Sequence, residues 1–227
     1  MGRGALRALI AAAVAVGGAS ACQGSGSVTC GALPAAPESS RPSFDAAPDP
    51  SLAAGAHWEA TVSTTCGDIV VLLDGAAAPR AVASFVELAR SGYWQDSRCD
   101  RLTARLAPSR VRQCGDSPGR VQTPPGYDLG PENVPAGHRY ERGMVGMVTP
   151  GFHRASAGEF FLVYEDFTAT PDTVAEPAIV GRVVSGMAVL DAIAAEGVED
   201  GVSDWHPFVN VGVESVSVSR RRDGASP

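Results

Sequence analysis

Residues 66–94 read CGDIVVLLDGAAAPRAVASFVELARSGYW, and this stretch decides the fold class. An apolar run at 69–74 is followed, after a short turn, by a segment at 79–93 whose apolar side chains recur every three or four residues. That spacing is typical of a helix packed on one face. Pro79 suits a first helical turn and Gly92 suits a helix end. The stretch therefore predicts a strand followed by one amphipathic helix.

Short apolar runs separated by Gly and Pro continue on both sides of this stretch. Residues 57–65 form an apolar run that joins 69–74 through a tight turn, as a β-hairpin does. Further strands are predicted at 110–114, 143–148, 159–164, 178–184 and 209–219, with a second helix at 186–195. Seven or eight short strands with two isolated helices favour an all-β dominated fold, a closed antiparallel eight-stranded β-barrel capped by two α-helices.

The N-terminus has the pattern of an export signal over residues 1–21. Arg3 and Arg7 precede an apolar run at 8–16, which is too short to span a bilayer of ~30 Å. The residues ASA before Cys22 fit ordinary signal peptidase, whereas ASAC resembles a bacterial lipobox with Cys22 as the lipidated residue. We favour the lipid anchor because a polar segment follows it. We therefore expect an exported protein of the cell envelope, anchored through lipid to the outer face of the cytoplasmic membrane.

The composition changes twice along the chain. Residues 22–56 are rich in Pro, Ala, Ser and Gly without apolar periodicity, which predicts a flexible tether. The folded domain is expected at 57–220, followed by a C-terminal tail at 221–227. No internal repeat is visible and no feature indicates an oligomer, so we expect a monomer.

Charge and motifs exclude several classes of function. The chain of 227 residues has a net charge of -7, from 18 Lys+Arg and 25 Asp+Glu. A nucleic-acid partner is not expected, since binding to a phosphate backbone needs clustered cations. The fingerprints of serine hydrolases and of dinucleotide or phosphate loops are absent. The four histidines are scattered and no C-x-x-C occurs, so neither a metal nor another cofactor is expected.

Five motifs stand in an order that resembles the cyclophilins, the barrel family of peptidyl-prolyl isomerases. They are residues 66–94, CDRL at 99–102, QCGD at 113–116, ERGMVGMV with GEFFLVY at 141–148 and 158–164, and IVGRVVSGMAVLDAI at 179–193. The resemblance covers residues 61–218. It implies the barrel fold and a peptidyl-prolyl cis-trans isomerase acting on Pro-containing segments of exported proteins.

The same resemblance assigns roles to individual side chains. Arg101 matches the family's catalytic arginine, Gln113 its cleft glutamine and Phe161 the floor of its proline pocket. Further substrate-binding residues are expected at Val111, Met147, Val148, Thr149 and Glu159. An arginine N–H suits this chemistry because it interacts more strongly with the prolyl nitrogen of a twisted amide than with that of a planar one. The other arginines between 98 and 116 are expected to be solvated or to make loop contacts.

The chain also departs from the family pattern. Arg110 stands where a pocket phenylalanine is usual, and Pro177 where a pocket histidine is usual. The loop at 165–178 lacks the expected tryptophan, and Phe167 is a candidate for part of that wall. A second hypothesis therefore remains open: a non-catalytic cyclophilin-like module that binds or chaperones Pro-containing segments.

Besides Cys22 the chain has four cysteines, at positions 30, 66, 99 and 114. An even set outside the cytoplasm indicates disulfides, with three connectivities open. Strand pairing as in the family would place Arg101 opposite about Arg112, and Cys99 opposite Cys114. The resemblance thus favours a Cys99–Cys114 bridge and leaves Cys30 to pair with Cys66.

Overall fold

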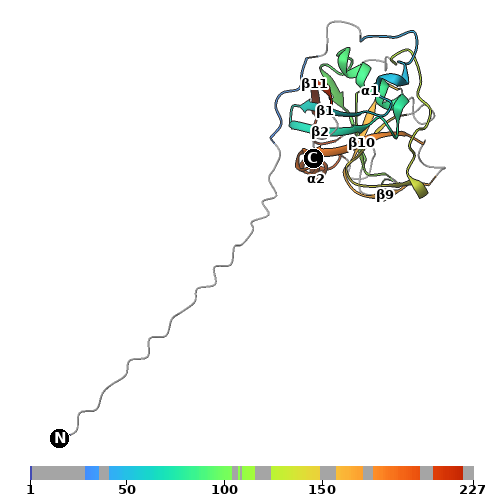
Figure 1. Ribbon diagram of the computed structural model, residues 1–227. Helices are drawn as coiled ribbons and strands as arrows, with labels where there is room; N and C mark the ends of the chain where they lie inside the picture. The colour runs from blue at the N-terminus through green and yellow to red at the C-terminus, as the bar shows by residue number, and fades with distance from the viewer. Residues whose placement is uncertain are drawn as a thin grey trace.

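The computed structural model describes residues 1, 29–35, 41–103, 107, 109–115, 124–148, 157–170, 176–199 and 207–221. The fold is mostly β (Figure 1). The strands are β1 (His57–Thr64), β2 (Gly67–Asp74), β3 (Ser97–Cys99), β4 (Arg101–Leu102), β5 (Val111–Cys114), β6 (Arg139–Tyr140), β7 (Met144–Met147), β8 (Phe160–Val163), β9 (Phe167–Thr168), β10 (Ala178–Ser185) and β11 (Val211–Arg220). The helices are α1 (Pro79–Arg90) and α2 (Met187–Glu196), with 3-10 turns η1 (Pro50–Leu52) and η2 (Ala136–His138).

One antiparallel sheet of nine strands nearly closes on itself. Its strand order is β3-β11-β1-β2-β10-β7-β8-β5-β4, while β6 and β9 form a separate pair. The two ends of the sheet, β3 and β4, are consecutive in the chain with only Asp100 between them. Counted as one interrupted strand, they complete an eight-stranded barrel. The predicted barrel is confirmed, and in Figure 1 the two helices lie at opposite ends of it.

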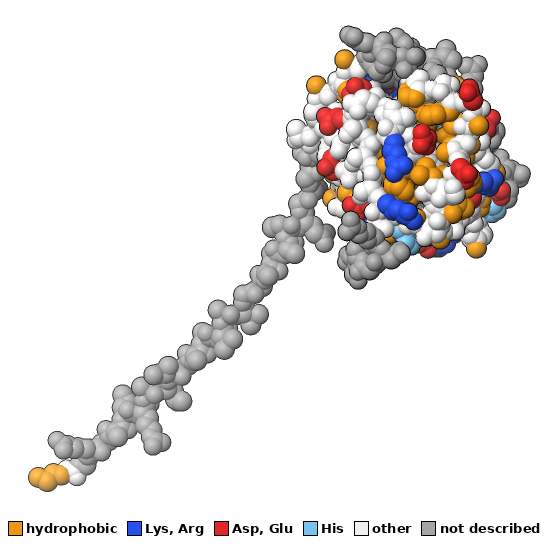
Figure 2. Space-filling view, turned by 45° about the horizontal axis from the view of Figure 1, so that its top comes forward, with side chains coloured by type: hydrophobic (Ala, Val, Ile, Leu, Met, Phe, Trp, Pro, Cys, Tyr) orange, Lys and Arg blue, Asp and Glu red, His pale blue; other side chains and the backbone are white. Residues whose placement is uncertain are grey.

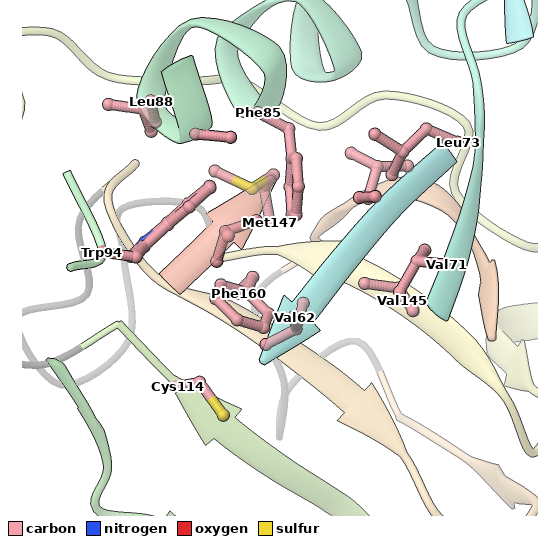
Figure 3. Packing of buried hydrophobic residues seen from close by; sticks show 14 of the residues in the cluster. Val62, Val71, Leu73, Phe85, Leu88, Trp94, Cys114, Val145, Met147 and Phe160 are labelled. Carbon is pink, nitrogen blue, oxygen red and sulfur yellow. The ribbon is translucent and has the colours of Figure 1, made fainter. Parts of the chain in front are cut away.

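The stretch that predicted the fold forms the centre of the core. Helix α1 begins at Pro79 and ends at Arg90, and its buried face faces the sheet. Figure 3 shows Phe85 pointing from α1 into the packed interior beside Met147. The rings of Phe85 and Trp94 lie 4.7 Å apart. This packing explains why the apolar stripe of one helix was a strong signal.

The predicted hairpin and both helices are confirmed. Strands β1 and β2 pair from His57 opposite Asp74 to Thr64 opposite Gly67. The last strand begins at Val211, two residues later than predicted. The two-residue strands β6 and β9 were not predicted, because so short a strand carries no measurable periodicity.

The segment predicted as a tether, 22–56, is described in part, at 29–35 and 41–56. These described residues contact the domain, since Gly31 N donates to the carbonyl oxygen of Thr65 at 2.7 Å and Phe44 N to that of Pro125 at 2.7 Å. Cys30 forms a disulfide with Cys66, and Ala53 is fully buried. The segment makes isolated contacts instead of presenting one periodic face, so its sequence carried no signal of order. Folded structure therefore begins before residue 57.

The predicted export signal, apart from Met1, and the predicted lipidated Cys22 lie outside the described residues. So does the predicted C-terminal tail beyond Arg221. Within the described part of the chain, no helix combines the length and the hydropathy that crossing a membrane requires.

Candidate active site

Five residues far apart in sequence form one row across the sheet. Arg101 on β4 pairs with Gln113 on β5, and Gln113 pairs with Phe161 on β8. Phe161 pairs with Gly146 on β7, and Gly146 pairs with Ile179 on β10. Directly opposed residues of antiparallel strands point to the same face of a sheet. The barrel therefore brings the predicted catalytic arginine and the predicted pocket floor onto one surface.

The polar end of this row is a chain of hydrogen bonds. Arg101 Nη1 donates to Gln113 Oε1 at 3.1 Å, and Gln113 Nε2 donates to Glu159 Oε2 at 2.9 Å. The amide of Gln113 is thus fixed at both ends, with its acceptor on the arginine and its donors on the carboxylate. Glu159 is 2% exposed. A buried carboxylate holds its partners strongly, because little water competes for them.

The apolar end of the row is a hydrophobic cluster separate from the main core. Its buried members are Val111, Tyr140, Phe161, Val163, Ala169 and Ile179, with Met144, Val148 and Phe167 partly buried against them. Gly146 makes room for this cluster, since a β-carbon there would stand 2.4 Å from Cζ of Phe161 and 3.0 Å from Cδ1 of Ile179. We call this set the pocket cluster.

One wall of the pocket cluster is an aromatic stack. Tyr140 and Phe167 lie parallel, with ring centroids 4.8 Å apart and an angle of 12° between the planes. Strands β6 and β9 hold the two rings in register, because Tyr140 pairs with Phe167. Burial raises the pKa of Tyr140, and the charge of Glu176 raises it further. Phe167 therefore packs against the pocket cluster through its stack with Tyr140.

The structure brings together most of the predicted site residues: Arg101, Gln113, Glu159, Phe161, Val111 and Val148. Met147 is the exception. It is fully buried in the main core and pairs with Phe160 rather than with Phe161. The structure places Met147 in the main core and Val148 in the pocket cluster, because side chains alternate along β7. Thr149 lies outside the described residues.

Five members of the pocket cluster were missed, namely Tyr140, Met144, Val163, Ala169 and Ile179. Ile179 reaches the site only through its pairing with Gly146, which a single sequence does not reveal. Tyr140 directly precedes the ERGMVGMV motif at 141–148. This position was the one feature of the sequence that could have indicated Tyr140 as a site residue.

Both favoured disulfides are present, Cys99–Cys114 and Cys30–Cys66. The predicted register is wrong by one residue, since Arg101 faces Gln113 and Leu102 faces Arg112. The corrected register strengthens the site, because it puts the arginine directly beside the glutamine.

Arg112, which was expected to be solvated or to make loop contacts, is buried. Its side chain is 1% exposed, and Nη2 donates to the carbonyl oxygen of Val209 at 3.3 Å. Burial lowers the pKa of Arg112 to about 10, while the charge of Asp100 acts in the opposite direction. This buried cation lies beside the row and not in it.

Outside the row, the surface carries charges of both signs, and the structure has a cavity. Figure 2 shows a face on which arginine and acidic side chains stand interspersed around a hydrophobic patch. A cavity of about 650 Å³ lies between Leu102, Tyr164 and the C-terminal end of α2, and none of the row residues lines it. Among the described residues, no group of His, Cys, Asp and Glu could hold a metal ion.

Comparison with known proteins agrees with this geometry. The family model described as "Cyclophilin type peptidyl-prolyl cis-trans isomerase/CLD" matches residues 60–218. A "Probable peptidyl-prolyl cis-trans isomerase B" of Mycobacterium leprae is 34% identical over 169 residues, which cover 69% of this chain and 55% of the relative. The protein of the same name from Mycobacterium tuberculosis H37Rv is 31% identical over 173 residues, covering 71% and 54%. The chain thus spans about half the length of these curated relatives.

A solved structure is also similar to this chain. It is a cyclophilin type peptidyl-prolyl cis-trans isomerase of Cryptosporidium parvum, with 17% sequence identity and a TM-score of 0.49. The match covers 73% of this chain and 99% of the other.

Proposed function

This chain belongs to the cyclophilin-type peptidyl-prolyl cis-trans isomerase family, and on that premise we propose that it catalyses the isomerisation of X-Pro bonds in exported or cell-envelope proteins. The observation that carries the proposal is the row across the sheet. In it, Arg101 and Gln113 lie beside Phe161 and the pocket cluster. A charged donor next to an apolar pocket is what the reaction needs.

The reaction breaks no covalent bond. An X-Pro amide is planar, and its rotation barrier is roughly 18–20 kcal/mol. Twisting the bond removes resonance and returns a lone pair to the prolyl nitrogen. An N–H of Arg101 directed at that nitrogen stabilises the twisted amide more than the planar one, which is the condition for catalysis.

Arg101 supplies only part of the required stabilisation. A charge-assisted hydrogen bond contributes about 1.5–3 kcal/mol, whereas a rate gain of ~10⁵ needs about 7 kcal/mol. The remainder is assigned to the pocket cluster, which holds the proline ring while the preceding residue turns. Gln113 contributes by fixing Arg101, and Glu159 contributes by fixing Gln113.

The cellular location is proposed from the N-terminal sequence and from the disulfides. Residues 1–21 have the pattern of an export signal, and Cys22 stands at a lipobox-like site. Two disulfides support export, because disulfides persist in oxidising compartments. A lipid-anchored protein would partition with membranes through Cys22, and Cys22→Ala would release it. Equal release of the wild-type protein would instead indicate ordinary secretion.

The competing hypothesis is a module that binds Pro-containing segments without turning them over. The row favours the enzyme, since a binding module has no need of an arginine fixed beside the pocket floor. Titration of a Pro-containing peptide, followed by a protease-coupled isomerisation assay on the same peptide, separates the two. Binding together with acceleration supports the enzyme, and saturable binding at the uncatalysed rate supports the binding module.

A further inference from the structure

We infer that Arg41, in the segment that precedes the barrel, is a positioning residue for the catalytic pair Arg101 and Gln113. The inference rests on the proposed isomerase function. Arg41 reaches the site by two routes, one through the backbone of β5 and one through buried side chains.

The first route is a backbone contact. The guanidinium Nη1 of Arg41 donates to the carbonyl oxygen of Gly115. Gly115 comes two residues after Gln113 and directly after Cys114, which is bonded to Cys99. Gly115 N also donates to the carbonyl oxygen of Arg98 at 3.0 Å. Arg41 therefore holds the end of the strand that presents Gln113.

The second route passes through Tyr93. The guanidinium carbon of Arg41 lies 5.1 Å from the centroid of the Tyr93 ring, close enough for a cation–π contact. Tyr93 is 1% exposed. Burial raises the pKa of Tyr93, Arg41 lowers it through its charge and a hydrogen bond, and the charge of Glu159 raises it. The phenol thus lies in the field of both Arg41 and the carboxylate that holds Gln113.

Tight packing joins the two routes. A β-carbon on Gly158 would stand 2.2 Å from the phenol oxygen of Tyr93. A β-carbon on Gly115, whose φ is +106°, would stand 2.6 Å from the carbonyl oxygen of Gly158 and 3.1 Å from Cα of Glu159. Trp94 Nε1 donates to the same Gly158 carbonyl at 2.7 Å. Because these residues are closely packed with no free space between them, we expect a displacement of Tyr93 or Gly115 to move Glu159 as well.

The charges alternate along this connection. Glu159 is buried, and a buried carboxylate is tolerated only where compensating charge and hydrogen bonds surround it. Glu159 is linked to Arg101 through Gln113, and Tyr93 lies within the electrostatic influence of both Glu159 and Arg41. The segment at 41–56 is thereby part of the support of the active site, and not only a connection to it.

The test compares Arg41→Ala with a matched control. Arg90 also stacks on a buried aromatic ring, 4.8 Å from the centroid of Trp58, but it touches none of the row residues. We expect Arg41→Ala to lower kcat/KM about ten-fold, mainly through kcat, as mutations that act on a site indirectly do. Arg90→Ala is expected to leave kcat/KM within about two-fold. Equal effects of the two variants would overturn the inference.

A second readout does not depend on turnover. The side-chain Nε–Hε NMR signal of Arg101, assigned with Arg101→Lys, is expected to shift in Arg41→Ala and to stay in place in Arg90→Ala. Tyr93→Phe keeps the ring but removes the phenol, and it is expected to shift the same signal even if Arg41→Ala does not fold. An unmoved signal in both Arg41→Ala and Tyr93→Phe would contradict the inference.

A thermodynamic cycle separates positioning from general stabilisation. In a Gln113→Ala background, Arg41→Ala is expected to lower kcat/KM less than two-fold. The Gln113 side chain, through which Arg41 is proposed to act on Arg101, is already absent in that background. A full ten-fold loss in that background would mean that Arg41 acts elsewhere. If the wild-type protein shows no isomerase activity, the proposed function fails, while the NMR comparison still decides the positioning of Arg101.

Discussion

The ring of Phe161 lies over Gly146, so closely that a β-carbon on Gly146 would stand 2.4 Å from Cζ of the ring. The two residues are register partners on β8 and β7. The missing side chain at Gly146 leaves the space that the ring occupies, between Gln113 on one side and Ile179 on the other. The position of the Phe161 ring therefore depends on the absence of a side chain at residue 146.

Gly146→Ala tests this relationship. The added methyl group must displace Phe161, and inserting a methyl into a packed site costs about 1–3 kcal/mol. We expect kcat/KM to fall about ten-fold, since the displaced ring narrows the pocket. Gly130→Ala is the control, because a β-carbon there meets nothing within 4 Å. Unchanged kinetics in Gly146→Ala would show that Phe161 is not the pocket floor.

The Cys99–Cys114 bridge stands next to Arg101 and Gln113 in the sequence. Replacing both cysteines by Ala is expected to lower the free energy of unfolding by about 2–4 kcal/mol and to lower kcat as Arg101 and Gln113 lose their fixed spacing. Urea denaturation and the isomerase assay measure the two effects.

The Cys30–Cys66 bridge provides the control, since it ties the N-terminal segment to the β1–β2 turn. Its double alanine variant is expected to lose stability but to keep kcat/KM within about two-fold. Equal loss of activity in both double variants would mean that the bridges act through stability alone.

The buried charge of Arg112 is predicted to lower the free energy of unfolding at neutral pH. Burial lowers its pKa to about 10, so the folded state holds the proton less firmly than the unfolded state. The penalty is therefore fully present below pH 10 and decreases as the pH rises above 10, because the folded state then loses the proton while the unfolded state still holds it. A shift of this size corresponds to about 3 kcal/mol.

Arg112→Met keeps the length of the side chain and removes the charge. We expect the free energy of unfolding at pH 7, measured in urea, to rise by about 1–3 kcal/mol, as found when buried charges are replaced by apolar residues. Arg110→Met serves for comparison. Arg110 directly precedes β5, and its guanidinium donates to the carbonyl oxygens of Ala107 and Ser109. A less stable Arg112→Met would show that Arg112 is fully compensated.

Phe167 is expected to act in place of the wall tryptophan that the chain lacks. Phe167→Ala removes the partner of the stacked Tyr140 and opens the pocket cluster on that side. Since a stacked aromatic pair contributes about 0.5–1.5 kcal/mol, KM should rise several-fold with little change in kcat. Phe208→Ala, at a phenylalanine that is 60% exposed, should leave both constants unchanged. An unaltered KM in Phe167→Ala would remove Phe167 from the wall.

The barrel could be predicted from sequence because its strongest elements depend on local periodicity. Helix α1 and the β1–β2 hairpin carry clear apolar patterns, and both appear where expected. Arg101, Gln113 and Phe161 could be identified from motifs in the right order, and the pairing of β4, β5 and β8 then places them together.

The remainder depends on register and on isolated contacts, which one sequence does not specify. A slip of one residue moves every side chain to the other face, and the expected pairing of Arg101 with Arg112 differs from the observed pairing with Gln113 by one residue. Arg112 was misplaced because arginine is rarely buried. Arg41 gave no signal, because its contacts with Tyr93 and Gly115 come from a segment without a repeating pattern.

The central claim is that Arg101 stabilises a twisted X-Pro amide beside the pocket cluster. NMR exchange spectroscopy on a Pro-containing peptide measures the isomerisation rate directly, with wild type, Arg101→Ala and Arg101→Lys at equal concentration. We expect the wild type to accelerate exchange and Arg101→Ala to reduce that acceleration by about 10- to 100-fold. Lysine should restore little of it, because it lacks the planar fork of arginine. A wild-type rate equal to the uncatalysed rate, or an Arg101→Ala rate equal to that of wild type, would contradict the claim.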